Sequence, residues 1–318
     1  MIKKGILFTT FSALCLSSVA SADTKLAIGS TSTVSPFYGY FVSVSNIINE
    51  NMPGYKATTI ETGASVENLV RMGRGQIDMG MITTDLMGDA IEGKGKFKGH
   101  EVDAKLLWVY FNIPQMTLVR KDSGVKELQD LDGIDFAPGF RGSGTEAATQ
   151  AVLELLDIKP KFFLGSAQDE MDAVKDKRAV GWTSSAMGHK VSASQIDVGS
   201  FVDLRPISLT DDEAETIKEG LPQLNIEKVP AGAAEGYPEF TTWSMGLGVA
   251  ATDEMDKDTA YNIVKSVMEN RDAQTHAMPQ TEDLDFMELT LKFAKTPLHP
   301  GAVKYFEEQG YEVPTELK

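Results

Sequence analysis

Cysteine is almost absent from this 318-residue sequence, and its one copy, Cys15, lies in an apolar N-terminal segment. That segment begins with Lys3 and Lys4 and ends in small residues at Ala22, which predicts a Sec-type signal peptide cleaved after Ala22. Its apolar part is too short to anchor the chain in a membrane. We therefore expect a mature protein in the periplasm that has no disulfide and is held together by its core.

Histidine is also scarce, and the four copies show none of the spacings typical of metal ligands. Ser143 lacks the G-x-S-x-G context of a hydrolase nucleophile, and no lysine follows its neighbouring glycines as in a phosphate-binding loop. The repeats expected of an adhesive protein are absent. We therefore expect no metal, no cofactor and no catalysis, with a secreted enzyme acting on a small anionic substrate as the alternative.

Basic residues are outnumbered, with 30 Lys and Arg against 46 Asp and Glu and a formal net charge of −16. An acidic protein repels polyanions, which argues against nucleic acid or anionic lipid as a partner. If the ligand is a small anion, local arginines and helix ends must attract it against this general field.

Three strand, loop and helix units open the mature chain. Short apolar strands are predicted at residues 25–29, 55–62 and 77–82, and each is followed by small polar residues and an amphipathic helix. This order favours a mostly parallel sheet in an α/β protein, because crossovers of one hand join such strands. Ligands bind at the carboxyl ends of the strands in these sheets, so the polar loops are expected to converge on one site.

Two long apolar runs divide the chain, at residues 105–120 and 239–252. The first is broken by Asn112 and Pro114 and is too long for one ordinary strand, so each run is interpreted as a crossing between two lobes. The predicted boundaries are 23–113 and 246–318 for lobe I and 114–245 for lobe II. A layout with both chain ends in one lobe is typical of a hinged two-lobe binding protein.

A glycine-rich loop at residues 139–145 precedes an amphipathic helix with apolar residues at helical spacing. Ser143 or Thr145 can cap this helix, and its first N–H groups then point outward and attract an anion. Arg141 adds a cation whose planar fork suits a carboxylate. The loop therefore predicts an anion site, although a capped surface helix with Arg141 in solvent fits the same residues.

The sequence resembles the TAXI group, the extracytoplasmic solute-binding subunits of tripartite ATP-independent periplasmic (TRAP) transporters. Four segments carry this resemblance: GSTSTVSPFY at 29–38, TGASVENLVRMGRGQIDMGMITTD at 62–85, VKELQDLDGIDFAPGFRGSGTEAA at 125–148 and PLHPGAVKYFEEQGY at 297–311. The resemblance implies a type II periplasmic-binding-protein fold with a hinge between two lobes. It also implies a ligand in the interlobe cleft, a small carboxylate such as glutamate or 2-oxoglutarate, and delivery to the membrane subunits of a TRAP transporter.

The predicted ligand-binding residues come from the polar loops, the crossing segments and the glycine-rich loop. Ser65 could instead be a simple N-cap, Tyr38 could pack against its helix, Arg141 could form a salt bridge between lobes, and aromatic residues near the cleft could belong to the core. We also expect a monomer. The full predicted set is Thr33, Ser35, Tyr38, Ser65, Thr84, Tyr110, Arg141, Ser143, Gly144, Thr145, Trp182 and Ser184.

Overall fold

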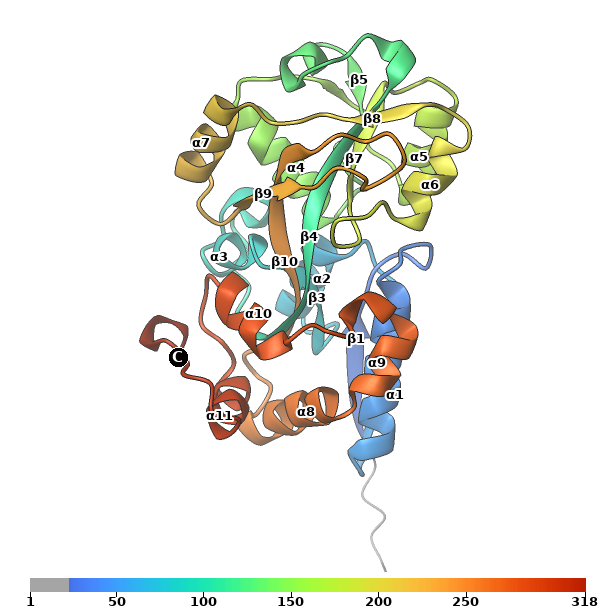
Figure 1. Ribbon diagram of the computed structural model, residues 1–318. Helices are drawn as coiled ribbons and strands as arrows, with labels where there is room; N and C mark the ends of the chain where they lie inside the picture. Colours follow the sequence, from blue (N-terminus) through green and yellow to red (C-terminus); the bar gives the residue numbers. More distant parts are fainter. Residues whose placement is uncertain (1–22) are drawn as a thin grey trace, which may run out of the picture.

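The computed structural model describes residues 23–318, so the predicted signal peptide lies outside the described residues. The chain forms one mixed sheet with helices packed around it, in two halves stacked one above the other (Figure 1). The strands follow the order β2-β1-β3-β10-β4-β7, with β8 also paired to β4 and β9 to β10. The predicted α/β fold is confirmed.

The lower half in Figure 1 begins with the three units predicted from the sequence. β1 pairs in parallel with both β2 and β3, as the crossover rule requires. The elements are β1 (Thr24–Gly29), α1 (Tyr38–Asn51), β2 (Tyr55–Ile60), α2 (Ser65–Gly73), β3 (Met79–Thr83) and α3 (Leu86–Ile91).

Two long antiparallel strands, β4 (Ala104–Arg120) and β10 (Phe240–Thr252), run through both halves. The predicted break in the first run is wrong, because β4 continues through Pro114. Pro114 is the last β4 residue paired with β10, and the pairing of β4 with β7 starts at Gln115. The missing proline N–H therefore falls at the junction between two partners, where its loss disturbs the ladder least.

The upper half is built on the far ends of these two strands. β7 and β8 pair with the second part of β4, and β9 pairs with the first part of β10. The elements are β5 (Asp135–Phe136), α4 (Gly144–Leu155), β6 (Lys161–Phe162), α5 (Ala167–Lys175), β7 (Gly181–Ser185), α6 (Ala193–Gly199), β8 (Leu204–Pro206), α7 (Asp211–Gly220) and β9 (Asn225–Val229).

After β10 the chain returns to the lower half (Figure 1). His299 ties the last helix to the sheet, since its N–H donates to the Leu106 carbonyl and its Nδ1 accepts from the Gly301 N–H. The helices are α8 (Lys257–Glu269), α9 (Arg271–Ala277), α10 (Phe286–Phe293) and α11 (Pro300–Glu308), and the short 3-10 turns of the chain are η1 (Gly95–Phe97), η2 (Lys121–Ser123), η3 (Leu128–Leu131), η4 (Pro279–Thr281) and η5 (Thr315–Leu317).

The predicted lobe boundaries fall at residues 113/114 and 245/246, inside β4 and β10. These positions face one another, because Ser244 pairs with Pro114 and Met245 pairs with Ile113.

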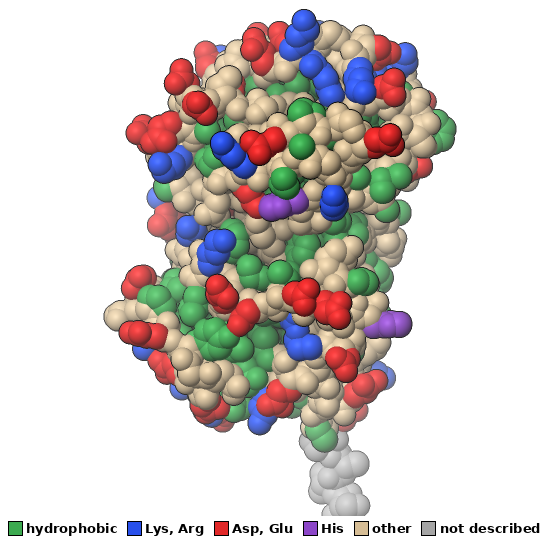
Figure 2. All heavy atoms as spheres, in the orientation of Figure 1, with side chains coloured by type: hydrophobic (Ala, Val, Ile, Leu, Met, Phe, Trp, Pro, Cys, Tyr) green, Lys and Arg blue, Asp and Glu red, His purple; other side chains and the backbone are tan. Residues whose placement is uncertain are grey.

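Acidic side chains are spread over both halves of the face shown in Figure 2, with lysine and arginine among them. On this face the negative charge is therefore not gathered over either half.

Candidate functional site

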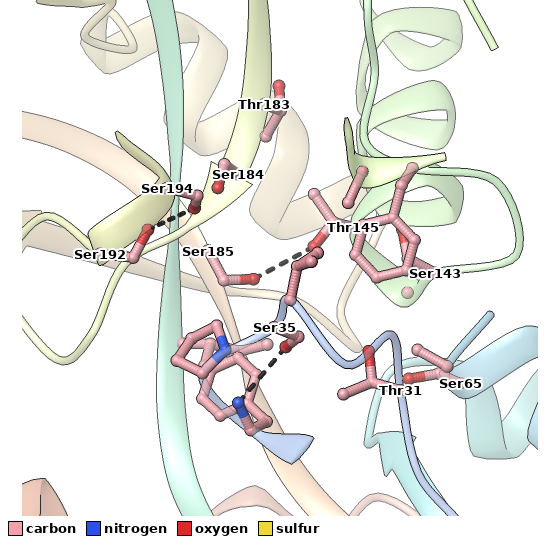
Figure 3. Close-up of a pocket in the computed structure, with 18 of the residues that line it drawn as sticks. Thr31, Ser35, Ser65, Ser143, Thr145, Thr183, Ser184, Ser185, Ser192 and Ser194 are labelled. Carbon is pink, nitrogen blue, oxygen red and sulfur yellow. Dashed lines mark hydrogen bonds between the residues drawn. The ribbon is translucent and has the colours of Figure 1, made fainter. Parts of the chain in front are cut away.

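A cavity lies where the two halves meet, at the carboxyl ends of β1, β3 and β7. The lower half contributes the loop after β1 and the start of α2, and the upper half contributes the starts of α4 and α5. Figure 3 shows the hydroxyl groups of both halves around this space. The lining residues are Thr31, Val34, Ser35, Pro36, Phe37, Ala64, Ser65, Met81, Thr83, Ile113, Phe140, Ser143, Gly144, Thr145, Ala167, Glu170, Met171, Trp182, Thr183, Ser184, Ser185, Ser192, Ser194 and Leu247.

The cavity is small. The volume open to the centres of water-sized spheres is about 90 Å³. One water needs roughly 10–15 Å³ on this measure, so the space suits a molecule of on the order of six to nine non-hydrogen atoms. Several aromatic and aliphatic side chains lie among the hydroxyls, as is usual for pockets that bind small organic molecules.

The two halves touch beside the cavity. The Val66 N–H in α2 donates to the Gly142 carbonyl in the loop before α4, with 3.0 Å between nitrogen and oxygen. The Lys96 ammonium in η1 donates to Gln150 Oε1 in α4 at 2.6 Å and lies 3.7 Å from Glu146 Oε1. These contacts hold the halves in a closed arrangement around the cavity.

The start of α4 forms one wall. Gly142, with φ of 82°, turns the chain into the helix, and the Ser143 hydroxyl accepts the Glu146 N–H as the N-cap. Gly144 and Thr145 are the first two helical residues, whose N–H groups have no acceptor within a helix. This end of the helix dipole attracts negative charge, so the wall can hold a carboxylate. Of the two predicted caps, Ser143 and Thr145, Ser143 is the one that caps this helix.

Three buried hydroxyls of the lower half line the cavity without a hydrogen-bond partner in the described residues. They are Thr31 Oγ1, Ser65 Oγ and Thr83 Oγ1, and each belongs to a residue less than 3% exposed. An unsatisfied buried polar group costs about 1–3 kcal/mol.

The interpretation of Ser65 as an N-cap is wrong, because Ala64 occupies that position and Ser65 begins the helix. Its hydroxyl is left available to a ligand.

One acid reaches the cavity. Glu170 in α5 is 2% exposed, and its Oε1 has no hydrogen-bond partner among residues 23–318. Burial, reinforced by the nearby carboxylates of Glu146 and Asp169, raises the pKa of Glu170 to about 9. The side chain is therefore a neutral acid at neutral pH unless a ligand supplies a positive charge.

The structure brings seven of the twelve predicted site residues together at the cavity. They come from four separate segments of the chain. Two of these segments meet where the Thr145 hydroxyl of α4 lies 3.2 Å from the Ser185 hydroxyl of β7 (Figure 3). The seven are Ser35, Ser65, Ser143, Gly144, Thr145, Trp182 and Ser184. Contact of each with a ligand stays a prediction.

Four other predicted residues lie away from the cavity lining. Thr33 is exposed and donates to Glu61 through its N–H at 2.9 Å, while Tyr38 is half-buried as the first residue of α1. The buried Thr84 hydroxyl accepts the Gly246 N–H at 3.1 Å. Tyr110 is fully buried and stacks on Tyr40 with 3.9 Å between ring centroids. The last two residues therefore stabilise the core of the lower half in this arrangement.

Arg141 also lies outside the cavity. Its guanidinium is exposed and donates weakly to the Leu164 carbonyl at 3.4 Å, over a neighbouring hollow that contains Glu67 and Asp169. The backbone of the same residue is fixed, because its N–H donates to the Gly165 carbonyl. A contact with a ligand would require the side chain to turn toward the cavity, and it stays a prediction.

Sequence reasoning missed several lining residues. Thr83 and Ser185 end β3 and β7 and directly neighbour the predicted residues Thr84 and Ser184, and Thr31 lies two residues before the predicted Thr33. Glu170 had a clearer signal: it shares a helix face with Ala167, Met171 and Val174, and an acid within an apolar stripe is seldom solvated.

Asn68 supports the cavity loops from below. It lies one turn after Ser65 in α2 and is fully buried. Its amide donates to the Ser30 and Met81 carbonyls at 2.8 and 2.9 Å, and its Oδ1 accepts the Thr62 hydroxyl. Asn68 therefore joins β1, β2 and β3 beneath the cavity loops.

Among residues 23–318, no group of three or more His, Cys, Asp or Glu side chains is placed to hold a metal ion. Within the same residues, no helix combines the length and the apolar character that a membrane crossing requires.

Solved structures share this fold. The chain matches XAC2383 from Xanthomonas citri, bound to ATP, at 14% identity with a TM-score of 0.52, covering 90% of this chain and 95% of that one. It matches the ligand-binding component of an ABC-type import system from Staphylococcus aureus, with zinc bound, at 14% identity and 0.50, covering 92% and 94%. It also matches an ancestral arginine-binding protein bound to arginine at 15% and 0.51, covering 80% and 97%. At these identities the likeness establishes the fold alone.

The sequence comparison reaches further than the fold. The model of the NMT1-like family matches residues 28–310, which is most of the chain and includes every residue that lines the cavity. This match identifies the NMT1-like family as a whole and does not show that the chain is a member of the TAXI group. The chain belongs to the NMT1-like family.

Proposed function

We propose that this protein is an extracytoplasmic solute-binding protein that captures a small organic anion, a carboxylate, in the cavity between its two lobes. In this proposal it delivers the ligand from the periplasm to the membrane subunits of a TRAP transporter and works as a monomer. Family membership and the resemblance to TAXI proteins support the transport role. Glutamate and 2-oxoglutarate, the ligands that this resemblance implies, are the first to test.

The enclosed, unpartnered hydroxyls of Thr31, Ser65 and Thr83 are the observation that carries this proposal. Leaving three polar groups buried and unsatisfied is unfavourable unless something supplies their hydrogen bonds. A carboxylate has acceptor sites for several hydroxyl donors at once. The free N–H groups at the start of α4 lie on the same cavity and add donors aimed at negative charge.

The closed arrangement supports capture between moving lobes. Among residues 23–318, few polar contacts outside the shared strands join the halves beside the cavity, and one of them is that of Val66 with Gly142. Hinge bending within β4 and β10 would open the cavity to solvent, and a ligand that contacts both walls would favour closure. Small-angle scattering should therefore show a smaller radius of gyration with saturating ligand than without it.

A thermal-shift screen of mono- and dicarboxylates and sulfonates tests the proposal. A ligand at 100 times its Kd adds about 2.7 kcal/mol of stability, which corresponds to a rise in Tm of several degrees for a chain of this size. The bound solute should be recovered unchanged by mass spectrometry. An unresponsive Tm across the whole panel would contradict the proposal, and chemical conversion of a bound anion would favour the enzyme alternative.

Thr31→Val provides a matched test of the cavity itself. The change removes an unpartnered buried hydroxyl at nearly constant volume, so the free protein should become more stable while the ligand-induced rise in Tm shrinks. Thr216→Val, on the exposed face of α7, is the control and should alter neither quantity by more than a small amount. Equal ligand-induced shifts in Thr31→Val and in the unaltered protein would place the ligand elsewhere.

A further inference from the structure

The cavity wall contains a single ionisable side chain. Among the described residues that line it, Glu170 is acidic and none is Lys, Arg or His. The positive ends of α4 and α5 supply the favourable field for a carboxylate, but a helix end carries only about half a charge. The wall can therefore hold one carboxylate and contains no cation for a second.

Glu170 is placed to meet a ligand. It lies in the first turn and a half of α5, between the lining residues Ala167 and Met171. Its Oε1 accepts no hydrogen bond within residues 23–318, although the residue is only 2% exposed. A buried acid without a partner is unfavourable, and a cation or a strong donor in the cavity would relieve it.

The rest of the wall is largely apolar. Large apolar side chains of both halves contribute to it, among them Phe37, Ile113, Phe140, Met171, Trp182 and Leu247. Of these, all but Phe140 are less than 10% exposed. A second carboxylate on the ligand would face either these side chains or the Glu170 carboxyl, and each contact would disfavour it.

We propose that Glu170 determines specificity by pairing with a protonated nitrogen of the ligand. The ligand class is then a small zwitterion with one carboxylate, one ammonium group and an apolar body, such as a small aliphatic amino acid. This inference rests on the proposed function, in which the carboxylate binds at the start of α4. It narrows that function, because dicarboxylates are excluded by the acid that attracts the ammonium group.

Proton release follows from this pairing. The charged groups around Glu170 are Glu146 on α4 and Asp169 on α5, and the other residues of the wall do not titrate. The raised pKa means that Glu170 holds a proton at pH 7 in the free protein. An ammonium ligand displaces that proton, so its affinity should rise with pH between 6 and 8 by up to tenfold per unit. An anion that accepts a hydrogen bond from neutral Glu170 would instead bind with nearly constant affinity over this range, because the acid stays protonated throughout it.

Calorimetric titration of the full mature chain with L-alanine, L-valine and L-leucine tests the inference. Each is compared with its analogue lacking the amino group, and L-glutamate and 2-oxoglutarate are included. The best amino acid should bind at least tenfold more tightly than its analogue and than either dicarboxylate. Heats measured in buffers of different ionisation enthalpy should show close to one proton released at pH 7.

Glu170→Gln keeps the size of the side chain and removes its charge. It should weaken the best amino acid at least tenfold, abolish proton release and leave the analogue without the amino group within about threefold. Glu219→Gln, which removes an exposed acid on α7, is the control and should bind as the unaltered protein does. Retained folding of Glu170→Gln is checked by circular dichroism.

Two other results are informative. Tighter binding of a dicarboxylate or of an amino-free analogue, or amino-acid affinity unchanged in Glu170→Gln, would overturn this inference and leave the capture of a small carboxylate standing. Failure of every carboxylate in the panel to bind would overturn both.

Discussion

Glu170 should make the free protein less stable as the pH rises. The unfolded chain releases this proton near pH 4.5, while the folded protein retains it up to about pH 9. Between these values the unfolded state binds fewer protons, so the free energy of unfolding falls with increasing pH. Each unit corresponds to 1.36 kcal/mol, so the step from pH 5 to pH 8 removes about 4 kcal/mol.

Glu170→Gln should abolish this contribution. Urea unfolding at pH 5, 6, 7 and 8, without ligand, gives the free energy of unfolding of both proteins. The variant should be close to the unaltered protein at pH 5 and more stable by about 4 kcal/mol at pH 8, since the amide never ionises. Glu219→Gln should follow the unaltered protein, because its carboxylate is exposed.

Parallel profiles for Glu170→Gln and the unaltered protein would refute the reasoning. They would mean that water or a partner group reaches the Glu170 carboxyl in solution and lets it ionise in the folded state. The same result would remove the physical basis for proton release on ligand binding.

Three further predictions concern residues beside the cavity. Burial raises the pKa of Asp85 to about 7 from 3.8, so stability should fall as the pH rises from 4 to 7. In the same urea series, Asp85→Asn should remove a loss of about 3 kcal/mol between pH 5 and pH 8. Gly144→Ala places a methyl group against the Thr83 side chain of the opposite half, which hinders closure of the two halves. Calorimetry should show ligand binding weakened at least tenfold. The Tm of the free protein should fall by no more than a few degrees. Arg141→Ala should weaken the free energy of ligand binding by less than about 1 kcal/mol, because the side chain is exposed. A loss of binding free energy of about 2–5 kcal/mol in calorimetry would instead support the ligand contact predicted from the sequence.

The sequence predicted the features that depend on local pattern. Alternation of apolar strands, polar loops and helices revealed the units around β1, β2 and β3, and the glycines before Ser143 revealed the start of α4. These signals are local, because a strand or a capped helix is specified by neighbouring residues.

The direction of individual side chains was harder to predict. Tyr110 and Trp182 both lie in strands whose two faces are buried, so alternation could not show that Tyr110 faces the core and Trp182 the cavity. The direction of Arg141 depends on its position between Gly139 and Gly142, which have φ of 118° and 82°. Such a backbone path cannot be derived from residue types alone.

Glu170 was missed for a different reason. Asp169 and Glu170 together look like the acidic first turn of an ordinary solvated helix, and Asp169 does accept the Ser166 N–H at 2.9 Å. Only the packing of α5 against the rest of the upper half separates a capping acid from a buried one.

The position of β10 has a consequence for the order in which the chain can fold. β10 is inserted between β3 and β4, two strands that precede it by more than a hundred residues and pair with it rather than with each other. Until residues 240–252 are available, both strands present unpaired N–H and C=O groups along one edge. The strand pairing of the lower half can therefore be completed only after about three quarters of the chain has been synthesised. Such distant pairing folds slowly, because the long intervening chain must be ordered before these contacts form.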